Sequence, residues 1–151
     1  MKHLFPLSTI IAFSFLVITG CQNDTDELPA PKTKTELITA SSWKFDKAMT
    51  GSFDISGNIN ACYKDNVVAF ISATNGTVSE GAVVCASPAP ATFTWSFQSS
   101  ETVLNLSAAL FTGSTGLFNI ISLTDASLVI SQDVIVPPSS TATNVVFYYK
   151  H

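Results

Sequence analysis

The chain contains no arginine: all seven of its basic residues are lysines, against eleven acidic residues. Its formal net charge is −4, and charged residues make up only 12% of the sequence. Nucleic-acid-binding domains carry basic patches to which arginine usually contributes. The acidic balance and the missing arginine therefore argue against a nucleic-acid partner.

Residues that carry chemistry are equally scarce. The two histidines, His3 and His151, lie near the two ends of the chain, so no base stands beside a nucleophile as a catalytic triad requires. A zinc site lacks ligands, and neither a calcium loop nor a glycine-rich phosphate loop occurs. The carboxylates of the main body are spread one per expected strand or turn, as Asp46, Asp54, Asp65, Glu80, Glu101, Asp125 and Asp133. We therefore expect no enzyme, no metal and no cofactor.

The most hydrophobic run of the sequence, Leu4 to Ile18, is too short to span a bilayer. As a helix it would reach about 22 Å, against a hydrocarbon core of about 30 Å. A positive start at Lys2, a short apolar stretch and small residues at Thr19-Gly20 are typical of a secretory signal peptide. Residues 1–20 are predicted to be that signal.

The end of this signal, Ile18-Thr19-Gly20-Cys21, resembles the lipobox of bacterial lipoproteins. The resemblance implies that the Cys21 thiol carries a diacylglycerol and that the chain is cut just before Cys21. The new amine would then receive a further acyl chain such as palmitate. Several chains hold a protein at a membrane, since each buried CH₂ contributes about 0.8 kcal/mol. We expect an anchor in the outer membrane; the alternative is an uncleaved anchor with an incidental cysteine.

Residues 21–36 are expected to form the lipidated cysteine and a flexible tether, because charge, proline and threonine replace any aliphatic pattern there. The acidic cluster Asp24, Asp26 and Glu27 resembles the signal that exports some lipoproteins to the cell surface. The alternative is a solvated linker facing the periplasm. Removal of Lys2 with the signal would take the net charge from −4 to −5.

Cys62 and Cys85 are the two cysteines that remain. Export places them in an oxidising compartment, and two cysteines allow a single intramolecular pairing. We therefore expect a structural disulfide between Cys62 and Cys85, which would close a loop of about 24 residues and contribute on the order of 3 kcal/mol. A redox pair or two metal ligands are the rival interpretations, although there is no C-x-x-C motif and no nearby histidine.

The body of the chain, residues 37–151, is predicted to be one all-β domain. Alternation is clearest in the segments 92–98 and 144–150, where every second residue is apolar. Asn75-Gly76 is a strong signal for a type I′ hairpin turn. About eight short strands in hairpin succession favour an antiparallel up-and-down β-barrel, since closure removes exposed edges.

Several short motifs resemble, in order and spacing, the lipocalin-like lipoproteins of Gram-negative bacteria. They are Leu37…Trp43-Lys44, Cys62-Tyr63-Lys64-Asp65, Asn75-Gly76-Thr77, Cys85, Thr94-Trp95-Ser96 and Ile120-Ile121-Ser122-Leu123-Thr124…Leu128-Val129. The resemblance implies a lipocalin-like barrel. True lipocalins open their first strand with Gly-x-Trp, where this chain has Ser41, and usually carry an arginine near the closed end. The resemblance therefore extends to the barrel and not to their ligands.

Aromatic residues are the remaining clue to function. Seven are expected to face the barrel interior and are candidate ligand-binding residues: Trp43, Phe45, Phe93, Trp95, Phe97, Phe147 and Tyr149. A barrel of about eight strands just admits one small molecule. We expect a membrane-anchored lipoprotein that binds a small hydrophobic ligand or a glycan. The alternative is a structural or interaction module of the cell envelope whose barrel is filled.

Overall fold

The computed structural model describes residues 29–151, and residues 31–151 form one compact unit. The expected signal peptide, Cys21 and the first part of the expected tether lie outside the described residues. Within residues 29–151, no helix is both long enough and apolar enough to cross a membrane.

The folded unit begins before the expected boundary at residue 37, because a short helix precedes the first strand. Helix α1 (Lys34–Thr39) opens with a capping box, in which the Thr33 amide donates to the Glu36 carboxylate (2.7 Å) and the Glu36 amide donates to the Thr33 hydroxyl (3.2 Å). This reciprocal pair satisfies two otherwise free amides. The Thr33 amide and the Thr33 hydroxyl both donate to the Glu36 carboxylate, and these bonds hold the pKa of the Glu36 carboxyl below its usual range. Ile38 is fully buried, so α1 is anchored in the core.

Within residues 29–151, nine strands form one antiparallel sheet. They are β1 (Ser42–Thr50), β2 (Phe53–Asp54), β3 (Val67–Phe70), β4 (Asn75–Ser79), β5 (Thr92–Gln98), β6 (Val103–Leu106), β7 (Leu117–Leu123), β8 (Ser127–Val134) and β9 (Thr143–Lys150). Between β2 and β3 lie a 3₁₀ turn, η1 (Ser56–Asn58), and helix α2 (Ala61–Lys64).

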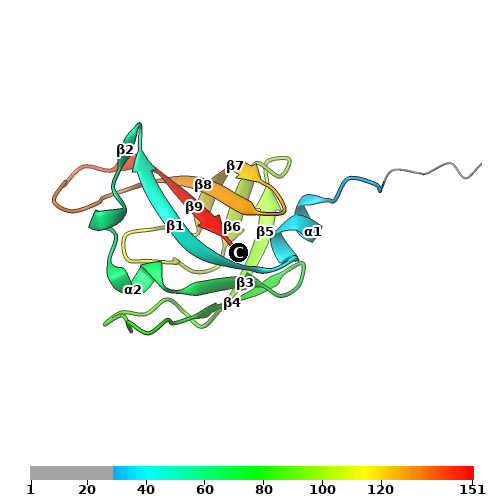
Figure 1. Ribbon diagram of the computed structural model, residues 1–151, viewed down its shortest axis with the longest axis horizontal. Coiled ribbons are helices and arrows are strands. Elements are labelled where there is room, and N and C mark those ends of the chain that lie inside the picture. Colours follow the sequence, from blue (N-terminus) through cyan, green and yellow to red (C-terminus); the bar gives the residue numbers. More distant parts are fainter. Residues whose placement is uncertain (1–28) are drawn as a thin grey trace, which may run out of the picture. The chain divides into compact units, whose positions relative to one another are not determined.

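The sheet closes on itself. Strands β3 to β9 pair in sequence order, and β1 pairs with β3 through residues 42–44 and with β9 through residues 44–49 (Figure 1). The short β2 pairs with the last two residues of β1. The predicted all-β class and sequential antiparallel order are confirmed, with nine strands where about eight were expected.

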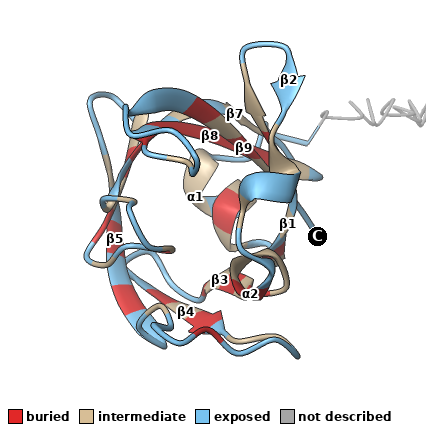
Figure 2. Cartoon of the chain, turned by 90° about the vertical axis from the view of Figure 1, so that its left-hand side faces the viewer, coloured by how far each residue is buried: buried red, intermediate tan, exposed pale blue. Residues whose placement is uncertain are grey.

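The two ends of the closed sheet differ in their connections. At the end covered by α1, the strands are joined by the short segments 71–74, 99–102 and 124–126. At the opposite end, which carries α2, the connections are the longer segments 51–66, 80–91, 107–116 and 135–142. Figure 2 looks onto this α2 end, with the strands around the circumference and α1 behind them.

Alternate side chains of each strand fill the interior. Trp43, Phe118 and Phe147 are among the largest fully buried side chains. A row of edge-to-face aromatic pairs runs from Phe70 to Trp95 and on to Phe97, with 5.2 Å between ring centroids at each step. Such edge-to-face contacts are the favoured geometry for aromatic pairs, so these rings pack as a core.

The predicted turn at Asn75-Gly76 is wrong. Both residues belong to β4, and the chain reverses direction at residues 71–74 instead. Gly76 pairs with Phe93 across the β4–β5 ladder, and a Cβ at position 76 would overlap the Phe93 ring. Glycine is therefore needed at position 76 because an aromatic side chain lies so close, and not because the backbone has a positive φ.

The β5–β6 connection contains three successive left-handed residues, Ser99, Ser100 and Glu101, at φ of 51°, 54° and 60°. The Thr102 hydroxyl donates to the Ser99 carbonyl (2.7 Å), and the Lys34 ammonium of α1 donates to the Glu101 carbonyl (2.5 Å). Left-handed residues that carry a Cβ cost about 1–2 kcal/mol each, so this turn is strained.

Replacing Ser100 by glycine should relieve part of that strain. We expect Ser100→Gly to raise the free energy of unfolding in urea by about 1 kcal/mol. The matched control is Ser96→Gly in the extended β5, where glycine should lower stability by about 0.5–1 kcal/mol. Equal effects of the two substitutions would show that the turn is not strained.

Candidate functional site

Cys62 and Cys85 are joined in the structure, with their Cα atoms 5.2 Å apart, as the sequence predicts. This separation lies within the usual range for a disulfide. The bond ties α2 to the 80–91 segment, two of the connections at the α2 end. Nowhere between residues 29 and 151 do three histidine, cysteine or acidic side chains gather as a metal site would require.

Hydrogen bonds order the segment around Cys85 as well. The Glu80 carboxylate accepts from the Cys85 amide (3.1 Å) and from the Asn66 side-chain amide (3.3 Å). The Asp65 carboxylate accepts from the Val83 amide (2.9 Å). These two acidic residues therefore hold a surface loop in place.

The structure brings the seven predicted ligand-binding aromatics into one interior but leaves no room among them. Five are buried and the other two, Phe45 and Phe97, are half-buried against the same core. The interior void, lined in part by Trp43 and Tyr149, measures about 10 Å³. That is barely the space of one water molecule. Burial also raises the pKa of the Tyr149 phenol.

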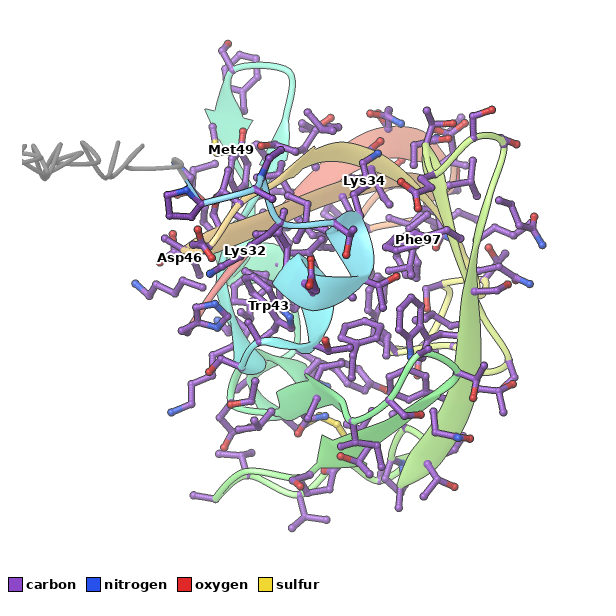
Figure 3. All side chains as sticks on the ribbon, turned by 90° about the vertical axis from the view of Figure 1, so that its right-hand side faces the viewer. Lys32, Lys34, Trp43, Asp46, Met49 and Phe97 are labelled. Atoms are coloured by element: carbon purple, nitrogen blue, oxygen red, sulfur yellow. A yellow bond between two sulfur atoms is a disulfide. The ribbon has the colours of Figure 1, made fainter. Side chains whose placement is uncertain are left out.

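Trp43 has a structural role at the α1 end. Its indole donates to the Ile38 carbonyl of α1 (2.9 Å), and its ring lies 4.1 Å from the imidazole of His151. The two ring nitrogens of His151 lie 2.9 Å from the Ser42 carbonyl and 2.8 Å from the Asp125 carbonyl. Figure 3 shows Trp43 beside α1. These contacts hold α1 and His151 over this end of the sheet.

A cleft of about 370 Å³ lies instead at the α2 end. Its walls come from η1 and α2, from the 107–116 connection, and from the end of β8 with the residues that follow. Phe111 separates the cleft from the core: its ring centroid lies 4.9 Å from that of Phe147 on the inner side and 6.3 Å from that of Tyr63. We call this space the Phe111 cleft.

A buried glutamine positions the connection that carries Phe111. The Gln132 side chain accepts from the Thr115 amide (3.0 Å) and donates to the Leu117 carbonyl and the Thr115 hydroxyl (2.5 Å each). Gly116 completes the arrangement, because a Cβ there would overlap the Leu106 carbonyl. The Phe111 cleft is therefore a preformed feature of the fold.

The Phe111 cleft was not predicted from the sequence. Phe111 and Tyr63 lie outside the strands, where no alternation marks them, and strand periodicity pointed to the interior instead. Polar groups in the cleft include Asn58, Asn60 and Thr112, and no residue that lines it carries a charge.

By its fold, the protein is therefore an all-β unit with a closed antiparallel sheet, a filled interior and a cleft at one end. No protein-family model matches the chain, and a search of curated proteins finds no significant match.

Removal of the Gln132 side chain should destabilise the 107–116 connection, which carries Phe111. We expect Gln132→Ala to lower the free energy of unfolding by about 1–3 kcal/mol, because it removes a buried side chain and leaves the Thr115 amide and the Leu117 carbonyl without this partner. The control is Asn144→Ala, which removes an exposed amide bonded to Asp133 (2.9 Å) and should change stability by less than about 0.5 kcal/mol. Urea unfolding followed by tryptophan fluorescence measures both; comparable losses would contradict this role of Gln132.

Proposed function

We propose that the chain is a lipid-anchored protein of the bacterial cell envelope, with a lipocalin-like barrel that binds an uncharged small molecule, either hydrophobic or a glycan, at its α2 end. The observation that carries the proposal is the contrast between a void of about 10 Å³ inside the sheet and a cleft of about 370 Å³ at its end. Small-molecule sites typically occupy about 300–1,000 Å³.

The lining of the Phe111 cleft supports ligand binding over catalysis. Apolar walls from Ile59, Phe111 and Pro137 stand beside the amides of Asn58 and Asn60. Mostly apolar walls with a few fixed polar groups are typical of small-molecule sites. Among the residues that the structure describes, no carboxylate or lysine lines the cleft, so these walls offer no charged acid or base.

The proposed anchor is compatible with this site. A lipid on Cys21 would reach the folded unit through the segment that leads into α1, whereas the Phe111 cleft lies at the α2 end (Figure 1). The segment that enters α1 and the Phe111 cleft therefore belong to opposite ends of the folded unit.

The alternative function is an interaction module that works through its outer surface. The filled interior favours it, as do the apolar side chains Leu117 and Ile121 on β7, which are 51% and 56% exposed. A partner protein would cover these side chains and would not need the Phe111 cleft. Variants on β7 and in the Phe111 cleft therefore distinguish an interaction module from a small-molecule-binding protein.

Lipid attachment is tested by metabolic labelling with radioactive palmitate. The wild-type protein should be labelled and recovered with membranes, and Cys21→Ala should lose the label, because its side chain offers no thiol. The double variant Cys62→Ser/Cys85→Ser controls for other cysteines and should keep the label. Persistence of label in Cys21→Ala would contradict lipidation at this position.

Occupancy of the Phe111 cleft is tested by native mass spectrometry of the protein purified from its own membrane. We expect a bound uncharged molecule in the wild type and its loss in Ile135→Asp, which places a carboxylate at the cleft wall. Leu117→Asp is the matched control, since both side chains are about half exposed and Leu117 lies outside the cleft. A wild-type protein without a bound mass, or equal loss in both variants, would count against the proposal.

A further inference from the structure

The Phe111 cleft is flanked by a further cleft on each side, each of about 380 Å³ and open to solvent. The first flanking cleft shares Asn58, Val136 and Pro137 with the Phe111 cleft and continues toward Thr50 and Pro138. We call it the Pro138 cleft. The second, which we call the Pro88 cleft, shares Tyr63, Phe111 and Thr112 and continues toward Pro88 and Pro90. The three clefts therefore adjoin in a row across the α2 end.

A hydrogen bond joins the walls at each border between these clefts. At the Pro138 border, the Asn58 side-chain amide donates to the Pro137 carbonyl (2.9 Å). At the Pro88 border, the Tyr63 and Thr112 hydroxyls lie 2.6 Å apart, and Tyr63 also donates to the Ser87 carbonyl (3.2 Å). The Pro138 border thus links two connections that are distant in sequence and the Pro88 border links three, so the row of clefts is ordered before any ligand arrives.

The chemistry of the row is uniform. None of the residues that line the three clefts is charged, although the chain has a net charge of −4. Apolar side chains such as Phe111, Pro88 and Pro137 line the clefts together with side-chain amides and hydroxyls. Within residues 29–151, the side-chain oxygen of Asn58 (Oδ1) and the side-chain nitrogen of Asn60 (Nδ2) have no hydrogen-bond partner, so both are available to a ligand.

We propose that the three clefts form one groove that binds a neutral oligosaccharide, with successive sugars in successive clefts. The inference rests on the proposed function, since it takes the Phe111 cleft as the central subsite. A sugar ring offers C–H faces to apolar side chains and hydroxyl groups to amides, and the groove presents both kinds of group. An acyl chain would leave the amides unused and one side in water, whereas hydrophobic ligands are usually enclosed over most of their surface.

The order of the groove favours binding of an extended ligand. The disulfide fixes α2 to the 80–91 segment, and Gln132 fixes the connection that carries Phe111. A preformed site loses less conformational entropy when it binds, so contacts in three shallow clefts can add up to measurable affinity.

The test is isothermal titration calorimetry on the lipidated full chain in nanodiscs, with neutral oligosaccharides of increasing length from α-glucan, β-glucan, mannan and xylan. We expect one series to bind, with affinity that rises with length and then levels off once the three clefts are filled. Asn58→Ala should weaken the longest member at least tenfold, and Asn119→Ala, on the outer face of β7, should leave it unchanged.

A second variant keeps the test decisive if Asn58→Ala fails to fold. Thr112→Val removes a hydroxyl at the Pro88 border while keeping the shape of the side chain, and it should also weaken the longest oligosaccharide. The proposed groove is contradicted if none of the four series binds or if affinity does not depend on oligosaccharide length. It is also contradicted if neither Asn58→Ala nor Thr112→Val weakens binding. A native bound mass that is not a saccharide and is lost in Ile135→Asp overturns the oligosaccharide while the proposed function stands.

Discussion

Pairing between β1 and β9 is the contact on which the rest of the structure depends. Residues 44–49 of β1 hydrogen-bond to residues 146–150 of β9, while the start of β1 pairs with β3. This pairing removes the long open edges that a β-rich chain with few charges would otherwise expose. It also turns one face of every strand inward, so the apolar residues of distant hairpins share one core. The clefts at the α2 end exist because the closed sheet holds four long connections side by side.

Much of the sheet could be predicted from alternation. The segments around Trp95 and Phe147 are strands with their aromatic side chains inward, as expected. The prediction of a turn at Asn75-Gly76 was wrong because glycine can be required either by a positive φ or by a close neighbour. The close neighbour here is the Phe93 ring, which is distant in sequence, so the local pattern could not distinguish the two cases. Helix α1 was missed because its six residues give no periodic pattern, although Thr33 and Glu36 have the spacing of a capping box.

The candidate site was harder to predict, for a physical reason. Periodicity identifies side chains that face inward, and it does not tell whether the space between them is filled. Here the inward residues are large, and Trp43 and Tyr149 meet across a void of about 10 Å³. The Phe111 cleft depends on loop conformations fixed by Gln132 and by the disulfide, which are contacts between residues far apart in sequence. Local sequence patterns do not predict such contacts.

The placement of α1 and β1 has a mechanical consequence. Tension that reaches the unit through its N-terminal segment passes first to α1, whose Ile38 is fully buried, and then along β1. Because β1 runs from the α1 end to the α2 end and is paired with β3 and with β9, a pull along β1 against a load held at the α2 end would shear two ladders of hydrogen bonds at once. The strand that closes the sheet would then also carry the force between the two ends.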